Sequence, residues 1–331
     1  MPKASVLTKI KRNAIPIGLV LAALIGVLGL FLTFVPLPVS KVEELGVFVL
    51  DTSENERSGG FSGLEVQGNG LDFIALSDRA AFQHGRFQRQ EGRIVGVSDR
   101  HLDRLVSDLG NYSSADSEGL ALASDGRLFV SIEGSQGLNL FLPGHNDSAW
   151  VPAPKQVGQL SYNKGLESLA IDPDGKLIAI PERWPEEDGV VPLFRSSVGA
   201  TEMVVTLIPL KGTDKNEAAV KTDWDIPFYM PVTPGFDPVG ADFGPDGRLY
   251  VLERRYVWPL GVATQIRSFL YTETGLEDAQ LLLRTPLGAY DNLEGISVWR
   301  DEAGDIRISV ISDDNFNWFQ ETEIVEFRLR P

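Results

Sequence analysis

The sequence contains no cysteine, which excludes disulfides, thiolate metal sites, cysteine nucleophiles and iron–sulfur clusters. It has only three histidines, His84, His101 and His145, so a zinc site built from several histidines is not expected. Basic residues are also in deficit, with 30 against 46 acidic ones, and the net charge of −16 argues against binding nucleic acid through its phosphates. The sequence shows no Gly-x-Ser-x-Gly turn, EF-hand loop or nucleotide fingerprint. What it does have is 33 glycines, 20 prolines and a 43% hydrophobic share, which together indicate a folded, turn-rich protein.

The first 40 residues differ from the rest of the chain. An uncharged run extends from Ala14 to Val35 and no charge follows until Lys41, whereas basic residues precede the run. Because a helix of ~20 apolar residues crosses a membrane and basic flanks stay in the cytoplasm, we predict a single-pass anchor. The expected order is a cytoplasmic basic tail at 1–12, a transmembrane anchor at 13–35, a linker at 36–44 and a domain at 45–331. That domain is expected outside the cytoplasm, in the periplasm if the cell is Gram-negative. A cleaved signal peptide is the alternative, disfavoured by the length of the run and the lack of a small-x-small site.

One pattern recurs in the body of the chain. Its clearest copy runs from Glu118 to Glu133, where an apolar stretch reaches Asp125-Gly126 and a second β-rich stretch follows. Asp-Gly supplies the positive φ of a tight hairpin turn, so each copy predicts a β-hairpin. The five copies start at residues 62, 118, 167, 239 and 294. This spacing is too long for one hairpin and is typical of four-stranded propeller blades with loops.

These repeats predict an all-β protein, a β-propeller. At ~45–50 residues per blade, the body holds about six blades, with five as the alternative. The segment 202–208 is strand-like and lies within the longest interval, so we expect a degenerate blade there. Strands at both extremes of the body, 45–50 and 323–329, are expected to pair and close the ring.

A set of motifs resembles the phytase-like family, often described as "esterase-like activity of phytase". These motifs are Ser62-Gly63-Leu64, Ser77-Asp78-Arg79, Gly247 to Arg254, Asn292 to Ile296 and Ser312 to Phe316. The resemblance spans roughly Gly59 to Leu329 and implies an exported propeller with hydrolytic activity. The dense charge clusters of true β-propeller phytases are not found, so phytate is not expected as the substrate. The hairpins are also similar to those of gluconolactonase-type and NHL-type propellers, in which a Glu that begins the first strand can be a calcium ligand.

Acidic residues recur at equivalent positions of the hairpins. Because the two strands are antiparallel, the start of the first and the end of the second lie at the same face. Residues at starts are Glu118, Glu167 and Glu294, and residues at ends are Asp78, Glu133, Glu182, Glu253 and Asp313, with Asp314 adjacent. A ring of hairpins would bring these carboxylates to one mouth of the channel. Glu65 and Asp242 share another repeat position and are expected lower in the bore.

Carboxylates crowded around one axis need compensating cations. Ca²⁺ is the expected cofactor because it takes 6–8 oxygen ligands. The expected ligands are Glu118, Glu167, Glu294, Asp313 and Asp314. Arginines follow several strand ends, and of these Arg183 and Arg254 are expected to bind an anionic substrate. Two alternatives stay open: arginines neutralise the ring without metal, or the acidic side chains are solvated strand ends.

Two functions follow from this ring. The first is a calcium-dependent hydrolase of a small phosphoester or carboxylic ester, with Asp78 or His84 as general base and Arg79 stabilising negative charge. The second is a non-catalytic propeller of the cell envelope that binds a ligand or a protein. His84 is expected on a loop near the mouth. Aromatic residues after strand ends are expected to form either a ligand wall or blade packing: Phe316, Trp318, Phe319, Trp184, Tyr256 and Trp258.

Overall fold

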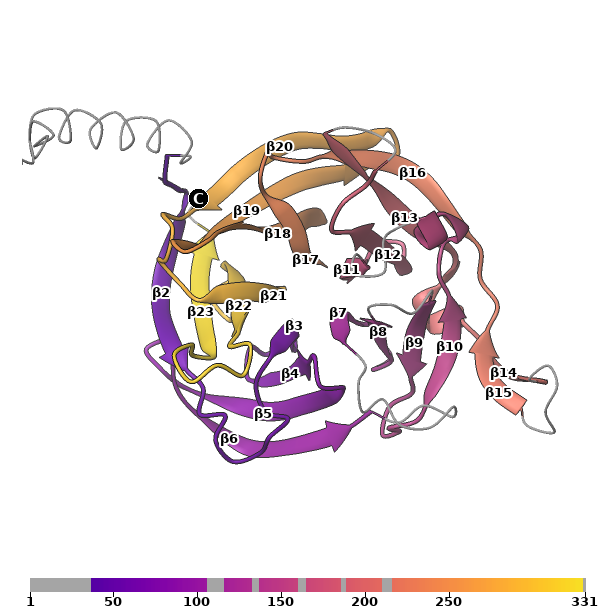
Figure 1. The fold of residues 1–331 in the computed structure, drawn as a ribbon, viewed down its shortest axis with the longest axis horizontal. Helices are drawn as coiled ribbons and strands as arrows, with labels where there is room; N and C mark the ends of the chain where they lie inside the picture. Colours follow the sequence, from indigo (N-terminus) through magenta and orange to yellow (C-terminus); the bar gives the residue numbers. More distant parts are fainter. Residues whose placement is uncertain are drawn as a thin grey trace, which may run out of the picture. The chain divides into compact units, whose positions relative to one another are not determined.

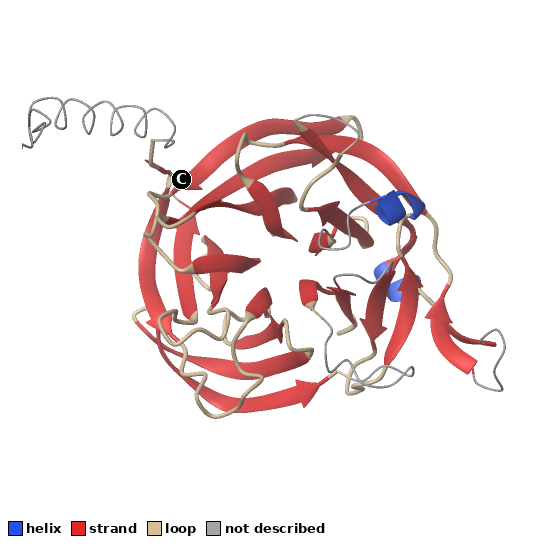
Figure 2. Ribbon diagram, viewed as in Figure 1, coloured by secondary structure: helices blue, strands red, loops and turns tan. Residues whose placement is uncertain are grey.

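The computed structural model describes residues 37–105, 116–132, 137–159, 165–185, 189–209 and 216–329. The chain divides into two compact units, Met1–Leu37 and Pro38–Pro331, and the second is described below. It is almost entirely β-structure, with only two short 3₁₀ helices, Lys155–Gln159 and Ala200–Glu202, among the described residues (Figure 2). Within those same residues, no helix has the length and apolar character needed to span a membrane. The predicted anchor at 13–35 lies outside them.

Five β-sheets stand around a common axis as the blades of a propeller (Figure 1). In each of the first three blades, strands that follow one another along the chain lie successively farther from the axis. The first blade contains β3 (Phe61–Val66), β4 (Asp72–Ser77), β5 (Ala81–Gln90) and β6 (Arg93–Arg104). The second contains β7 (Ser117–Leu122), β8 (Leu128–Ile132), β9 (Gly137–Phe141) and β10 (Ser148–Pro152). The third contains β11 (Leu166–Ile171), β12 (Lys176–Pro181), β13 (Val190–Gly199) and β16 (Trp224–Pro231).

The last two blades use strands from the start of the domain at their outer edges. The fourth contains β17 (Asp237–Phe243), β18 (Arg248–Val257), β19 (Gly261–Thr272), β20 (Gly275–Arg284) and the edge strand β1 (Val39–Ser40). The fifth contains β21 (Asn292–Arg300), β22 (Ile306–Asp313), β23 (Glu323–Leu329) and β2 (Val42–Val49). β2 pairs antiparallel with β23, with Val42 opposite Leu329. The predicted closure of the ring by strands from the two extremes is therefore confirmed.

The preference for six blades is wrong, and the longest repeat interval explains why. It holds an insertion rather than a degenerate blade: β14 (Val205–Pro209) and β15 (Asn216–Val220) form a hairpin between β13 and β16. β15 pairs in parallel with β10, so the hairpin extends the outer edge of the second blade. Strand-like sequence alone does not say which sheet a strand joins.

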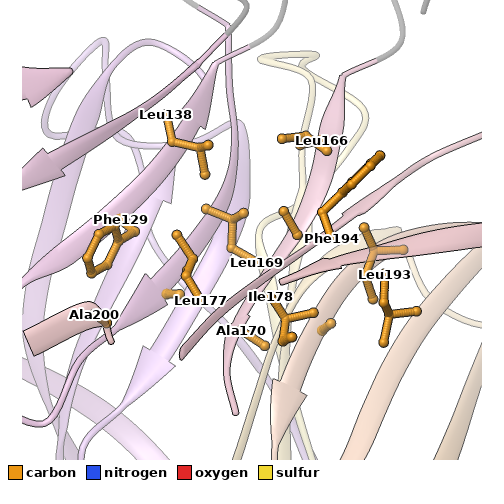
Figure 3. Packing of buried hydrophobic residues seen from close by; sticks show 14 of the residues in the cluster. Phe129, Leu138, Leu166, Leu169, Ala170, Leu177, Ile178, Leu193, Phe194 and Ala200 are labelled. Atoms are coloured by element: carbon orange, nitrogen blue, oxygen red, sulfur yellow. The ribbon is translucent and has the colours of Figure 1, made fainter. Parts of the chain in front are cut away.

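Side chains pack between neighbouring blades to form the core. Successive residues of a strand point to opposite faces of the sheet, so inner strands bury both faces. Figure 3 shows Phe129 of the second blade beside Leu177 and Leu169 of the third, with Phe194 of the third blade farther along the same cluster. All four side chains are at most 1% exposed, and each contributes roughly 1.5–3 kcal/mol by leaving water. This packing fixes the inner strands that form the channel.

Small residues let the five inner strands approach one another closely at the axis. They occupy the second position of each repeat: Gly63, Gly119, Ser168, Gly240 and Gly295. A Cβ added to Gly295 would lie 2.8 Å from the backbone of Gly63, and one added to Gly240 would lie 2.5 Å from the carbonyl oxygen of Glu294. At this level the bore narrows to a space of about 10 Å³, too small for more than one water. The channel therefore has a closed floor below its mouth.

Gly295→Ala is expected to lower the free energy of unfolding by about 1–3 kcal/mol, the usual cost of overpacking a well-filled site. The added methyl meets backbone atoms of the next blade, which cannot move without shifting the ring. Gly68→Ala is the control, because nothing lies within 4 Å of its added Cβ. Chemical denaturation of both variants measures the difference, and equal stability of the two would contradict a tightly closed floor.

Candidate functional site

A β-bulge places one side chain of four of the five inner strands at the mouth of the channel. The pairing of first and second strands shifts register around Glu118, at Glu167 and at Glu294, where two residues oppose one. A bulge bends its strand and re-aims the extra side chain. The equivalent positions in the other two blades hold Ser62 and Val239. Three of the five blades thus direct a Glu to the mouth.

These side chains line a cavity of about 290 Å³. Its carboxylates are Asp78, Asp116, Glu118, Glu167, Glu182, Glu294 and Asp313. Six of them are acidic residues that the sequence placed at the mouth. Asp116 and Ser62 were not foreseen as lining residues, although Asp116 stands two residues before a predicted strand start. The remaining lining residues in the part of the chain that the structure describes are Arg254 and Asn315, and Arg254 is the only basic one among them.

Burial raises the pKa of four of these carboxyl groups, so they hold protons more tightly than usual. Removal from water, and then the charge of neighbouring carboxylates, raises the pKa of Asp78 to about 7. Burial is also the main cause that raises the pKa of Glu294 and of Asp313 to about 7. The pKa of Glu118 is raised well above its usual value by burial and then by Glu167, whose side chain shares a hydrogen bond with it. Two carboxylates make such a bond only when a proton lies between them, so the cavity attracts cations.

Arg254 partly compensates this charge. Its guanidinium contacts the carboxylate of Glu294, and its Nη1 donates to Asn292 Oδ1 at 3.1 Å. Burial acts to lower the pKa of Arg254, but Glu294 and Glu167 outweigh burial and the net effect raises it. The arginine therefore stays charged in a cavity where carboxylates outnumber it.

The loop after β22 holds Asp313 in place. Asn315 N donates to Asp313 Oδ1 at 2.6 Å, and Asn292 Nδ2 lies 3.3 Å from Asp313 Oδ2. Asn315 and Phe316 have φ of 47° and 51°, a left-handed conformation that costs about 1–3 kcal/mol at a non-glycine residue. Such strain is typical of functional sites.

Asp314 does not line the cavity, so the structure does not place it with the other expected ligands. Its carboxylate accepts hydrogen bonds from Gly60 N at 2.9 Å, Phe316 N at 3.0 Å and Thr322 Oγ1 at 2.9 Å. These contacts bind the loop to the neighbouring blade. Asp313 is the last residue of β22 and faces the cavity, whereas Asp314 begins the loop and its carboxylate is held by these three donors.

Glu253, another residue that the sequence placed at the mouth, does not line the cavity. Glu253 is fully buried inside its blade, where Arg267 binds both carboxylate oxygens at 2.6 and 2.7 Å. Gln265 Nε2 adds a third hydrogen bond at 2.7 Å. Glu133 lies outside the described residues.

The predicted arginines divide between the site and its surroundings. Arg79 is exposed, stacks on the ring of Phe316 at 3.3 Å from its centroid and is not among the cavity residues. Arg183 is also exposed and pairs with Asp237, its Nε 2.9 Å from Asp237 Oδ1. Arg254 alone reaches the acidic cavity.

The prediction that His84 lies on a loop at the mouth is wrong. His84 belongs to β5, the third strand of the first blade, where it stacks on His101. It is not among the residues that line the acidic cavity. The turn between β4 and β5 is shorter than the sequence suggested, since Ser77 pairs directly with Ala81.

A second, wider cavity of about 1190 Å³ adjoins the first and shares Glu182, Arg254 and Asn315 with it. Aromatic side chains line it and remain largely exposed: Tyr256, Trp258, Trp318 and Phe319. Arg183 and its partner Asp237 lie among the lining residues too. Trp184, in contrast, is buried against Phe194 and belongs to the core. The site is thus an acidic pocket beside an aromatic vestibule.

Glu65 and Asp242, which share a repeat position and are expected lower in the bore, interact through their charges. Their strands, β3 and β17, are not neighbours in the ring, yet the charge of Asp242 raises the pKa of Glu65, after burial as the larger cause. Each carboxylate accepts a backbone hydrogen bond from the next blade: Leu122 N to Glu65 at 2.9 Å, and Val298 N to Asp242 at 2.6 Å. Burial raises the pKa of Asp242 to about 7.

The raised pKa values of Glu65 and Asp242 predict that the free energy of unfolding falls as pH rises. A carboxyl group with a raised pKa contributes stability that is present below its unfolded pKa of about 4 and is lost as pH rises through its folded pKa, which is about 7 for Asp242. Glu65→Gln keeps the acceptor for Leu122 and removes the buried charge. The variant is expected to be more stable than the native chain at pH 8 by at least about 1 kcal/mol, since a tenfold change in proton affinity is worth about 1.4 kcal/mol. Thermal unfolding between pH 5 and 8 measures this, and a native profile that rises with pH would contradict it.

Comparison with known families matches residues 56–316 to the phytase-like family, described as "Esterase-like activity of phytase". No curated protein matches the chain. Solved structures similar to it include the PQQ-bound aldose sugar dehydrogenase of Streptomyces coelicolor, at 14% identity, 88% coverage of this chain and 99% of that one, with a TM-score of 0.41. Virginiamycin B lyase of Staphylococcus aureus is similar at 11% identity, with 86% and 99% coverage and a TM-score of 0.39. Since the family match covers most of the chain, this protein belongs to the phytase-like family.

Proposed function

We propose that the axial cavity binds Ca²⁺ and hydrolyses a small phosphoester or carboxylic ester that carries negative charge. The observation that carries the proposal is the gathering, among the described residues, of seven carboxylates with one arginine in a single cavity. Carboxylates held at this density, with pKa values raised toward neutrality, are typical of sites that bind a cation or transfer a proton.

The donors of the cavity fit Ca²⁺. They are hard oxygen atoms, which this cation prefers, and buried Asp78 Oδ1 has no hydrogen-bond partner in the described structure. Glu118, Glu167 and Asp313 are the proposed ligands, with Glu294 shared between the cation and Arg254. A bound Ca²⁺ would supply charge that polarises an ester oxygen.

The chain's own residues account for the remaining steps. Arg254 reaches both cavities, so it holds the anionic end of an ester that enters through the vestibule. Asp78 is the general base, because its pKa of about 7 lets its carboxylate take a proton from water near neutral pH. The water oxygen then bonds to the ester phosphorus or carbonyl carbon, the ester bond breaks, and the leaving alkoxide takes the proton from Asp78 and departs as the alcohol.

The test is hydrolysis of p-nitrophenyl phosphate and p-nitrophenyl acetate with Ca²⁺ and with EGTA. Asp78→Asn is expected to lose roughly 10²–10⁴-fold in kcat, the usual contribution of a general base. Asp72→Asn is the matched control, because Asp72 lies at the turn end of β4 and pairs with Arg86. Turnover that survives EGTA, or that survives in Asp78→Asn, would sink the proposal.

A second function, ligand binding without turnover, is favoured by the vestibule. Trp318 is 94% exposed and Trp258 is 78% exposed beside the cavity, and exposed aromatic groups of this kind commonly mark ligand or protein contacts. Under this account the site retains a small anionic ester or a protein of the cell envelope. Binding with no release of p-nitrophenol would support it over hydrolysis.

We also propose, from the sequence, that residues 13–35 tether the propeller to a membrane with the propeller outside the cytoplasm. The uncharged run and the basic residues before it support this orientation. A reporter active only outside the cytoplasm, fused after Pro331, is expected to be active. Recovery of the protein in the cytosolic fraction would contradict the tether.

A further inference from the structure

We propose that His84, His101 and Asp103 form a second metal site, on the outer strands of the first blade, for a borderline divalent cation such as Zn²⁺. One ligand atom from each of the three residues lies within 4.8 Å of the other two. The scarcity of histidine argued against such a site in the sequence. The fold nevertheless brings two of the three histidines together.

The register of β5 and β6 explains the arrangement. His84 is directly opposite His101, and Asp103 follows two positions later on β6, so all three side chains share one face of the sheet. The two imidazole rings stack at 4.5 Å, only 2° from parallel. Both Nε2 atoms face the same oxygen, Asp103 Oδ2, at 3.4 Å from His84 and 3.9 Å from His101. A small movement of the rings would place a cation between the three atoms.

The surroundings of His101 prepare its Nε2 for a metal. Its other ring nitrogen, Nδ1, lies 3.4 Å from the carbonyl oxygen of Asp99. A ligating histidine usually donates its second N–H to such an oxygen, which fixes the ring and leaves the first nitrogen available. Asp99 itself has a φ of 51° and lies in a register shift that re-aims the strand just before His101.

The chemistry of the donors separates this site from the axial one. Imidazole nitrogen suits Zn²⁺, Ni²⁺ and Cu²⁺, whereas the oxygens of the axial cavity suit Ca²⁺. Three protein ligands leave a fourth tetrahedral position for water or an outside group. The side chain of His101 is 61% exposed and that of Asp103 is 38% exposed, so a cation can enter from solvent.

Calorimetric titration of the purified chain with Zn²⁺ tests the site. We expect one high-affinity site in the native chain and a loss of at least tenfold in affinity in His101→Asn and in Asp103→Asn, since both residues are partly exposed and tolerate substitution. His145→Asn is the matched control, because His145 is equally exposed and lies beside a single aspartate, Asp147. It is expected to bind Zn²⁺ as the native chain does.

Electron paramagnetic resonance of bound Cu²⁺ gives an independent readout. Coupling to two imidazole nitrogens is expected in the native chain, and to one in His101→Asn. Glu118→Gln, in the axial cavity, is expected to leave this spectrum unchanged. Native Zn²⁺ affinity in His101→Asn, or a Cu²⁺ spectrum without nitrogen coupling, would overturn the proposal.

Discussion

Arg254→Gln is expected to bind Ca²⁺ at least about tenfold more tightly than the native chain while losing roughly 10²–10³-fold in kcat. The arginine is the only basic residue among the described lining of the cavity, so its removal relieves repulsion of the incoming cation. At an effective dielectric constant of about 20, unit charges ~6 Å apart interact by roughly 3 kcal/mol, more than the 1.4 kcal/mol of a tenfold change. The loss of turnover follows because Arg254, which holds the anionic end of the ester, is also placed to donate to the negative charge that develops in the transition state, and such a fixed donor is typically worth 10²–10³-fold.

This prediction is specific because Arg254→Gln is expected to raise the affinity for Ca²⁺ and to lower kcat. Calorimetry gives the affinity for Ca²⁺ and steady-state kinetics gives kcat for the same protein. Arg86→Gln is the control, because Arg86 pairs with Asp72 away from the cavity, and it is expected to change neither quantity. Weaker Ca²⁺ binding in Arg254→Gln would mean that the arginine only holds the ring together, and would contradict its proposed role.

Arg267→Met is expected to lower the free energy of unfolding by about 3–5 kcal/mol. Glu253 is fully buried, and Arg267, itself 9% exposed, is its counter-ion and bonds both of its oxygens. Removing one partner of a buried ion pair leaves a charge without compensation in a low-dielectric interior, which is the costly event. Gln265 alone then remains hydrogen-bonded to the carboxylate.

The double variant Glu253→Leu/Arg267→Met separates the cost of the orphaned charge from the worth of the pair. It is expected to be more stable than Arg267→Met alone, because apolar replacements of a buried pair are often close to neutral. Urea unfolding of the three proteins measures the differences. If Arg267→Met lowers the free energy of unfolding by less than about 1 kcal/mol, the buried ion pair does not stabilise the fold in this way.

The sequence predicted the propeller correctly because its signal is local and repeated. Each Asp-Gly turn demands positive φ, and Gly126 and Gly175 show φ of 87° and 77° between paired strands. The strands at the two ends of the domain correctly predicted that the ring closes by pairing them. The number of blades could not be predicted in the same way, because the hairpin β14–β15 joins the edge of another blade through contacts distant in sequence.

The sequence also located most of the acidic cavity, since residues at equivalent repeat positions share a place around the axis. It could not tell Asp313 from Asp314, or Glu182 from Glu253, because neighbouring partners decide which carboxylate is free to face the mouth. The sequence analysis also did not predict the β-bulges at Glu167 and Glu294. The small residue that follows each Glu, Ser168 or Gly295, was the local feature that could have indicated them. The pairing of His84 with His101 depends on register, which the sequence did not reveal.

The most direct test of the account is a calorimetric Ca²⁺ titration at pH 7, repeated in two buffers with different ionisation enthalpies. Because Asp78 and Asp313 have pKa values of about 7, binding of the cation is expected to release protons, with one Ca²⁺ bound per chain. Glu118→Gln/Asp313→Asn is expected to bind at least about tenfold more weakly. A native chain that takes up no Ca²⁺ at millimolar concentration, or a double variant that binds as tightly as the native chain, would contradict the central claim.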